Sequence, residues 1–219
     1  MIEQILPDRS VGVDVFEDPP EAKLWPEEEA LVAGSVEKRR LEFTTARHCA
    51  RQALAGLGAP PAALLSGPKR EPLWPSGIVG SITHCTGYRA AVVAWDRDIA
   101  SLGVDAEPNG PLPTGVLASI ALDAERDRVE ELLTQRPEVR WDRLLFSAKE
   151  SVYKTWYPLA RRWLDFDEAD ITFDPDRGTF DVRLLVPGPV LPGRGMLTQM
   201  TGRWLAQSSL VVTAITIDR

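Results

Sequence analysis

The stretch FSAKESVYKTWYP, from Phe146 to Pro158, has the residue spacing of a helix with two apolar sides. At about 100° per residue, one side carries a core stripe of Leu145, Ala148, Val152, Trp156 and Leu159. The opposite side carries Phe146, Glu150, Tyr153 and Tyr157, with Lys154 at its edge and the small residues Ser147, Ser151 and Thr155 between the two. Glu150 is therefore expected in a partly dry place, where a carboxylate needs a cation or hydrogen-bond donors. The alternative is an ordinary surface ion pair of Glu150 with Lys154.

The flanking sequence predicts an α+β protein. We expect helices near residue 26 and over about residues 35–57, 123–133 and 141–160. Strands are expected on both sides of a turn at Thr86-Gly87, again up to Pro108, and through most of the C-terminal third. The helix–strand order occurs twice and a proline-rich junction lies at residues 108–113. This predicts two α+β halves, residues 1–108 and 109–219, in one compact unit.

A second signal is the strand segment SLGVDAEP, in which Asp105 and Glu107 are two residues apart. Alternate side chains of a strand leave the same face, so the two carboxylates repel each other unless a cation lies between them. Together with Glu150 they make three oxygen donors, a ligand set that suits Mg²⁺ when substrate phosphate completes the shell. Taken alone, the pair is equally typical of a solvated strand face.

A third signal is a group of basic side chains suited to phosphate. Arg47 and Arg51 lie one helical turn apart, Lys69 and Arg70 follow in a proline-flanked loop, and His84 lies in GSITHC. Arginine forks and histidine bind phosphate oxygens well. The alternatives are a solvated helix face for the arginines and a packed histidine at a turn. Acids and bases together predict a magnesium ion facing a groove for a substrate with several phosphates.

Composition excludes other classes. The chain has 219 residues and a formal net charge of −7, which is unfavourable for a nucleic-acid-binding protein. No run of 18 apolar residues predicts a membrane span, and the N-terminal residues do not resemble a secretory signal. The two cysteines, Cys49 and Cys85, are expected to be free thiols. We therefore expect a cytoplasmic protein that does not bind nucleic acid or membranes.

With these residues in hand, the chain resembles the Sfp-type 4′-phosphopantetheinyl transferases, in the subgroup of enterobactin synthase component D and actinobacterial relatives. The family motif G-[IV]-D-x-E matches Gly103 to Glu107. The motif [WF]-x-x-K-E-[AS]-x-x-K matches Phe146, Lys149, Glu150, Ser151 and Lys154. An upstream S-x-T-H segment matches Ser81, Thr83 and His84, and two subgroup segments match around Arg47 and Trp74. Ala106 leaves the middle of the first motif without a third strand carboxylate.

The resemblance implies a fold and a reaction. The fold would be two similar α+β halves related by a pseudo-twofold, with coenzyme A in the cleft between them. The reaction would move the 4′-phosphopantetheine arm of coenzyme A to a serine of an apo acyl or peptidyl carrier protein, releasing adenosine 3′,5′-bisphosphate. The expected enzyme is a monomer of the holo-[acyl-carrier-protein] synthase type. Its natural carrier, from fatty-acid, polyketide or nonribosomal-peptide synthesis, stays open.

The roles expected of the residues follow from this reaction. Asp105, Glu107 and Glu150 would bind Mg²⁺. Glu150, directly or through a metal-bound water, would accept the serine proton. Lys154 would neutralise or protonate the leaving group, and Lys149 would hold pyrophosphate oxygens. The remaining nucleotide-binding side chains would be Arg39, Arg47, Lys69, Arg70, Thr83 and His84.

Two alternatives compete with this assignment. A magnesium nuclease also combines acids with a lysine, although the spacing here and the negative net charge are unfavourable for it. A non-catalytic module that binds coenzyme A or a carrier protein is the other, although binding alone does not need three carboxylates facing phosphates. The segment GVLASIALDAERDR after Pro113 is either part of a carrier-docking surface or an ordinary amphipathic helix with its lead-in.

Overall fold

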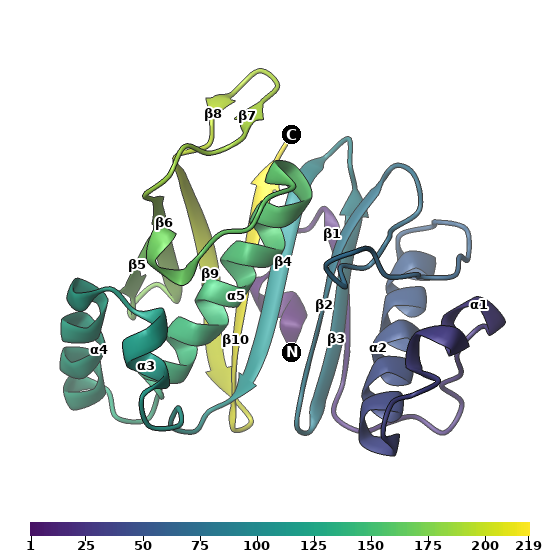
Figure 1. Cartoon of the computed structure of the whole chain (residues 1–219), viewed down its shortest axis with the longest axis horizontal. Helices are drawn as coiled ribbons and strands as arrows, with labels where there is room; N and C mark the ends of the chain where they lie inside the picture. The colour runs from purple at the N-terminus through teal and green to yellow at the C-terminus, as the bar shows by residue number, and fades with distance from the viewer.

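The computed structural model describes residues 1–219, which form two antiparallel sheets with their edges side by side and helices on the outer faces (Figure 1). The first sheet has the order β1-β3-β2, with β1 at Ser10–Val15, β2 at Ile78–Cys85 and β3 at Tyr88–Trp95. The second has the order β4-β10-β9-β6-β5. Its strands are β4 (Ile99–Pro108), β5 (Ala169–Asp174), β6 (Thr179–Leu184), β9 (Gln199–Gln207) and β10 (Leu210–Asp218).

Each sheet has one long helix packed on it. Helix α2 (Glu37–Gly56) covers the first sheet, and α5 (Trp141–Ala160) covers the second, with α3 (Val116–Ile120) and α4 (Asp123–Gln135) outside it (Figure 1). Short elements complete the chain: η1 (Ile2–Ile5), α1 (Pro26–Glu29), η2 (Ala30–Val32), η3 (Phe166–Glu168) and the hairpin of β7 (Val190–Leu191) and β8 (Gly195–Met196). The helices and sheets are mixed, so the predicted α+β class is confirmed.

Three groups of buried apolar side chains hold these layers together. One joins α5 to the second sheet through Trp141, Trp156 and Phe180. A second joins α2 to β3. The third spans the two sheets, because Tyr88 and Val92 of β3 pack in one cluster with strands β4 and β10. The two sheets therefore share part of their core.

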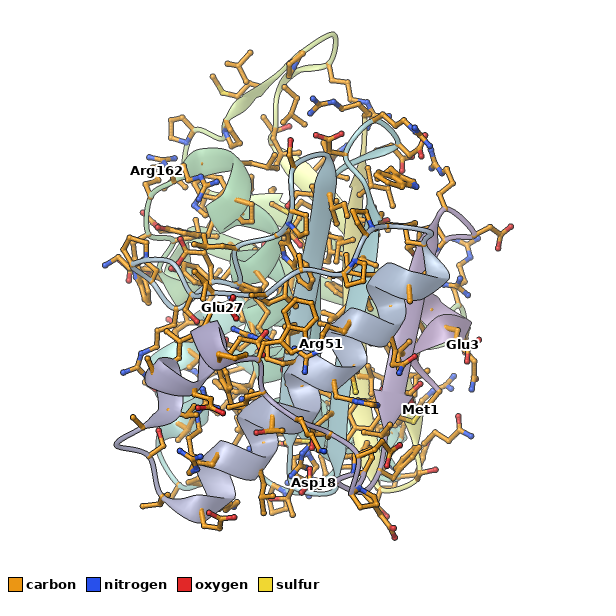
Figure 2. The ribbon with its side chains drawn as sticks, turned by 90° about the vertical axis from the view of Figure 1, so that its right-hand side faces the viewer. Met1, Glu3, Asp18, Glu27, Arg51 and Arg162 are labelled. Carbon is orange, nitrogen blue, oxygen red and sulfur yellow. The ribbon has the colours of Figure 1, made fainter.

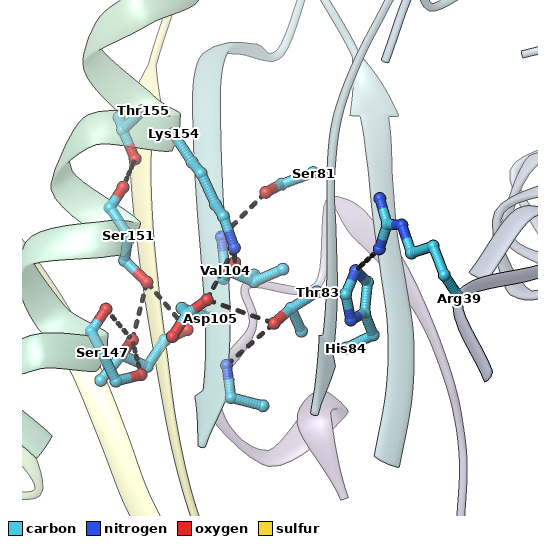
Figure 3. Close-up of polar contacts among 12 residues, drawn as sticks. Arg39, Ser81, Thr83, His84, Val104, Asp105, Ser147, Ser151, Lys154 and Thr155 are labelled. Carbon is cyan, nitrogen blue, oxygen red and sulfur yellow. Dashed lines mark hydrogen bonds and ion pairs between the residues drawn. The ribbon is translucent and has the colours of Figure 1, made fainter. Parts of the chain in front are cut away.

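Side-chain hydroxyls join the facing edges of β2 and β4. Ser81 Oγ accepts a hydrogen bond from the backbone N–H of Val104 at 3.1 Å, and Thr83 Oγ1 accepts one from Ala106 at 3.0 Å (Figure 3). No backbone ladder joins β2 to β4. These hydroxyls satisfy buried N–H groups that would otherwise lack an acceptor. We call this contact the β2–β4 seam.

The strand β4 pairs with β10 in the second sheet, although the predicted boundary at residue 108 assigns it to the N-terminal half. The pairing runs from Ile99 to Pro108, so the second sheet begins about ten residues before the predicted junction. Most other elements follow the sequence prediction, including α5 at 141–160, α4 from Asp123, and the turn between β2 and β3. Strand β1 was not predicted. No helix is long and apolar enough to cross a membrane.

Candidate functional site

A cavity of about 1010 Å³ lies between the two sheet–helix layers. Its N-terminal wall comes from α2, β2 and the loop at residues 66–74, and its C-terminal wall comes from α5. Basic side chains from the first wall and Glu150 and Lys154 from the second line the same space. Five more of the residues predicted to form the site line the cavity: Arg39, Arg47, Lys69, Arg70 and His84. Arg161, which was not predicted, lines it from the opposite wall.

Asp105 is held at the seam by groups from both layers. It is buried, and its Oδ1 accepts hydrogen bonds from Lys154 Nζ at 2.7 Å and Thr83 Oγ1 at 3.3 Å (Figure 3). The same lysine also donates to the carbonyl of Val104 at 3.1 Å. The Lys154 ammonium is therefore bound to the strand that carries the acids. No ion pair joins it to Glu150, so the alternative of an ordinary surface pair is wrong.

Close packing of α5 on β4 brings these groups together. A Cβ built on Gly103 would lie 2.2 Å from the carbonyl oxygen of Ser151 and 2.5 Å from Thr155 Oγ1. The small side chains of α5 continue the contact through Thr213 of β10, which bonds to Ser147 and Ser151 (Figure 3). Only glycine on the strand and small residues on the helix permit this distance. This accounts for the small residues Ser147, Ser151 and Thr155 on one side of the helix.

Glu107 has a different partner, which the sequence reasoning missed. Arg143, two turns before Glu150 on α5, donates to Glu107 Oε2 at 3.1 Å. The same guanidinium donates to the carbonyls of Gly110 and Pro111, so it also holds the loop that follows β4. Burial and the charge of Asp105 raise the pKa of Glu107, and Arg143 opposes this rise. The i+36 separation of the pair leaves no local signal in the sequence.

Glu150 lies half-buried at the cavity with no ion-pair partner. Burial raises the pKa of its carboxyl group, the positive charge of Lys154 lowers it, and the negative charge of Asp105 raises it further. A carboxylate in this environment binds a proton more readily than one in water. That property suits a proton acceptor.

The three acids do not form a ready-made metal centre. No group of three or more His, Cys, Asp or Glu side chains is close enough to hold an ion. One observation nevertheless fits a cation beside Asp105: its Oδ2 is buried and has no hydrogen-bond partner. A buried carboxylate oxygen without a partner is costly, and a bound cation would remove that cost.

On the opposite wall, Arg39 and His84 are in contact. Arg39 Nη1 lies 2.6 Å from His84 Nε2 (Figure 3), and Glu42 Oε2 lies 3.7 Å from His84 Nδ1. Burial, followed by the charge of Arg39, lowers the pKa of His84. His84 therefore lines the cavity as a neutral ring bonded to a cation, and it is not a histidine packed away from the site.

The predicted cations of this wall differ in burial: Arg47 is buried, Arg39 is half-buried, and Lys69 and Arg70 are exposed. The Nε of Arg47 donates to the carbonyl of Leu64 at 2.8 Å and its guanidinium lies 4.2 Å from the ring centroid of Phe43. Burial lowers the pKa of Arg47 to about 10. Lys69 and Arg70 lie exposed on the cavity loop. The alternative of a solvated helix face is thus wrong for Arg47.

Glu28 holds the segment that leads into this loop, and the sequence reasoning did not single it out. Its fully buried carboxylate accepts from Arg51 Nη1, from Trp25 N and from Leu64 N, each at 2.9 Å. Figure 2 shows Arg51 between α2 and α1. Leu64 is therefore held through its N–H by Glu28 and through its carbonyl by Arg47. Arg51, one turn from Arg47, is used in this support and does not line the cavity.

The structure does not bring Lys149 to the large cavity. Its Nζ lies 2.8 Å from Glu125 Oε2, and the two side chains are each 1% exposed. The same ammonium donates to the carbonyls of Phe166 and Ala169. Burial lowers the pKa of Lys149, and Glu125 opposes this shift. With its hydrogen-bonding capacity used inside the protein, Lys149 has no donor directed at the cavity.

Thr83 is also placed away from the cavity, since its hydroxyl is buried in the seam between Asp105 and the Ala106 N–H. The two cysteines are free, Cys49 buried and Cys85 half-buried, as expected.

Comparison with known proteins identifies the class of protein. Residues 27–94 match the 4′-phosphopantetheinyl transferase N-terminal domain, and residues 101–187 match the 4′-phosphopantetheinyl transferase superfamily. The chain belongs to this superfamily. It is an enzyme that transfers 4′-phosphopantetheine, as the motifs around Asp105 and Glu150 predicted.

Three relatives are similar over almost the whole chain. The 4′-phosphopantetheinyl transferase Svp of Streptomyces mobaraensis is 56% identical over 220 residues, covering 99% of this chain and 89% of the relative. Npt of Nocardia iowensis is 50% identical, covering 98% of this chain and 99% of the relative. PptT of Mycobacterium tuberculosis is 50% identical, covering 93% and 90%. More distant matches are named enterobactin synthase component D. The predicted subgroup is confirmed.

Proposed function

We propose that this transferase moves the phosphopantetheine arm of coenzyme A to a serine hydroxyl of an apo acyl or peptidyl carrier protein. The observation that carries the proposal is the single cavity of about 1010 Å³ with a basic wall on one side and Glu150 with Lys154 on the other. A nucleotide with several phosphates needs cations. A hydroxyl nucleophile needs a proton acceptor. Both stand here within one space large enough for the nucleotide and the arm.

The basic wall binds the phosphates of the nucleotide through Arg39, His84, Lys69 and Arg70. The buried Arg47 adds a further positive charge to this wall. On the opposite wall, Glu150 accepts the proton of the incoming serine, because burial raises its pKa above that of an exposed carboxylate. Lys154 is near the strand acids and neutralises or protonates the leaving phosphate of adenosine 3′,5′-bisphosphate. Lys149 and Thr83 have positioning roles in this scheme, and Lys149 is not assigned to pyrophosphate.

Asp105, Glu107 and Glu150 are proposed to hold Mg²⁺. Support comes from the unpartnered Oδ2 of Asp105 and from the negative charge of Asp105, which raises the pKa of both Glu107 and Glu150. When bound, the ion would neutralise charge on the pyrophosphate. Arg143 and Lys154 hold two of the three acids in place in its absence.

The arrangement of the whole enzyme completes the proposal. We propose two similar halves related by a pseudo-twofold, with the division placed before β4, and a cofactor cleft at the cavity between them. The two family matches, which end at residue 94 and begin at residue 101, support that division. We further propose a monomer acting in the cytoplasm.

The test is to incubate the protein with Mg²⁺, coenzyme A and a panel of apo carrier proteins and to measure each carrier by intact-mass spectrometry. We expect a gain of one phosphopantetheine group on the active-site serine of at least one carrier. A carrier with its serine changed to alanine is the matched control. Unchanged mass of every carrier, with coenzyme A bound by the protein, would overturn the assignment.

A further inference from the structure

The contact between Arg39 and His84 fixes where the histidine proton lies. A guanidinium has donors only, so at 2.6 Å from Arg39 Nη1 the Nε2 of His84 must be the acceptor. The ring is then neutral, with its proton on Nδ1. That nitrogen faces the carboxylate of Glu42 at 3.7 Å.

Charged groups from three elements act on this ring. Arg39 and Glu42 come from α2, Arg89 from β3 and Lys154 from α5. Glu42 is the single anion among them and raises the pKa of His84, against burial and the three cations. Arg89 is itself paired with Asp18 at 3.1 Å. The surroundings of His84 therefore keep its ring neutral, and the Glu42 carboxylate lies on the Nδ1 side of the ring.

A phosphate changes the requirement at Nε2. Phosphate oxygens are acceptors, so the lone pair of a neutral Nε2 would repel them. Moving the single proton from Nδ1 to Nε2 would solve this but would direct the bare Nδ1 lone pair at the Glu42 carboxylate. Both neutral forms thus place a lone pair against an anion. Only the doubly protonated ring has a donor for each.

We propose that Glu42 couples binding of the 3′-phosphate of coenzyme A to the uptake of one proton by His84. The proton comes from solvent and binds Nε2, which then donates to a phosphate oxygen while Nδ1–H faces Glu42. Arg39 is released from the ring and donates to the same phosphate. Glu42 is in this scheme a positioning residue that acts through His84. The inference rests on the proposed function, because it takes coenzyme A as the ligand of the basic wall.

The pH dependence follows from linkage. Burial and Arg39 hold the pKa of His84 below its ordinary value in the free enzyme, and the phosphate dianion raises it in the complex. Between these two pKa values binding takes up about one proton, so affinity falls about tenfold for each unit by which the pH rises. The phosphate itself is mostly dianionic at pH 7.5, since its second pKa is about 6, and it does not supply this uptake.

Isothermal titration calorimetry of the full chain at pH 7.5 tests the proposal. Titrations in two buffers with different ionisation enthalpies, at equal magnesium concentration, give the number of protons taken up. We expect about one proton for coenzyme A and about none for 3′-dephospho-coenzyme A. The comparison uses the unaltered protein, so it does not depend on any variant folding.

The variant Glu42→Gln is expected to take up less than half as much proton with coenzyme A and to bind it about tenfold more weakly. Its affinity for 3′-dephospho-coenzyme A should not change. Glu37→Gln, an exposed carboxylate of the same helix, is the matched control and should behave as the unaltered protein. Equal proton uptake for the two ligands, or unchanged uptake in Glu42→Gln, would overturn the proposal.

The carrier assay separates this failure from failure of the proposed function. Carrier modification without ligand-dependent proton uptake sinks the role of Glu42 alone. Proton uptake on binding without modification of any carrier sinks the transfer reaction and leaves the coupling standing. No binding of coenzyme A overturns both.

Discussion

Lys149 and Lys154 lie five residues apart on α5 and have opposite surroundings. Lys149 is sealed against Glu125 and two carbonyls, and Lys154 reaches Asp105 at the cavity. At about 100° per residue the two positions lie about 140° apart around the helix axis, so their side chains leave different sides of the helix. Sequence spacing assigns both to one motif. Only the fold shows that one of them serves stability.

The substitution Lys149→Met should therefore destabilise the protein. Breaking a buried pair leaves the Glu125 carboxylate without its cation, at a cost of about 3–5 kcal/mol. Adding Glu125→Gln should recover part of that loss, because an amide needs no counter-charge and its single oxygen still accepts from one of the two N–H groups, Leu122 or Ile171, that the two carboxylate oxygens bind. Urea unfolding of both variants measures this. A stable Lys149→Met protein whose KM for coenzyme A has risen would restore Lys149 to the phosphate site.

The substitution Glu150→Gln should separate rate from stability. We expect kcat to fall about 10²-fold or more, since a positioned base contributes that much. The free energy of unfolding at neutral pH should stay equal or increase. The pKa of Glu150 is raised in the folded state, so folding disfavours the charged form above that pKa and an amide removes the penalty.

Thermal melting and the carrier mass assay measure both effects. Glu130→Gln, an exposed acid of α4, is the control and should change neither. Turnover close to that of the unaltered enzyme at saturating Mg²⁺ would remove Glu150 from the chemistry.

At the scale of elements, the distance between α5 and β4 sets the site. The contact at Gly103 lets the helix groups approach Asp105, and any added atom must push the two elements apart. The i, i+4 repeat of Ser147, Ser151 and Thr155 on α5 is the helical counterpart of this glycine.

Gly103→Ala should cost about 1–3 kcal/mol through overpacking. It should lower kcat more than it changes the KM for coenzyme A, because the basic wall is untouched. Steady-state kinetics with varied coenzyme A measures the split. Gly110→Ala is the matched control, since its added Cβ meets nothing within 4 Å. An equal loss in both variants would show that the close contact does not position the helix.

Local pattern predicts most elements and part of the site. Helix α5, the strands β2 to β4 and the acids on α5 and β4 follow from period, turns and motif spacing. Strand β1 does not, because its residues SVGVDV are all only half-buried and belong to a sheet only through pairing with β3. Arg143 and Glu28 are each bonded to a residue 36 positions away, Glu107 and Leu64 respectively, and no local pattern contains such a contact. The roles of Lys149 and Thr83 were missed for the same reason.

At the scale of the whole molecule, the two layers meet through the shared apolar cluster and the β2–β4 seam. The seam carries Asp105, so the contact that joins the layers also places a site acid. Both seam hydroxyls therefore support the interface, and that of Thr83 also supports the geometry of the site.

Thr83→Val should therefore affect both. Valine keeps the shape but leaves the Ala106 N–H without an acceptor and removes one of the two donors to Asp105, at a cost of about 1–3 kcal/mol. We expect amides of β4 to exchange faster with deuterium and kcat to fall. Ser81→Ala is the companion variant, which disturbs the Val104 N–H and leaves Asp105 alone. If both variants lose stability but keep kcat, the seam would have no role in placing Asp105.

The pairing of β4 with β10 determines where the polypeptide can be cut. Opening the chain in the turn at residues 96–98 leaves every strand of each sheet on one fragment, and the two pieces can then reassociate through their apolar edges. Opening it after Pro108 instead leaves β4 on the N-terminal fragment, separated from its partner β10, and exposes the backbone of β10. Fragment complementation, circular permutation or insertion of a reporter should accordingly be directed to the first position.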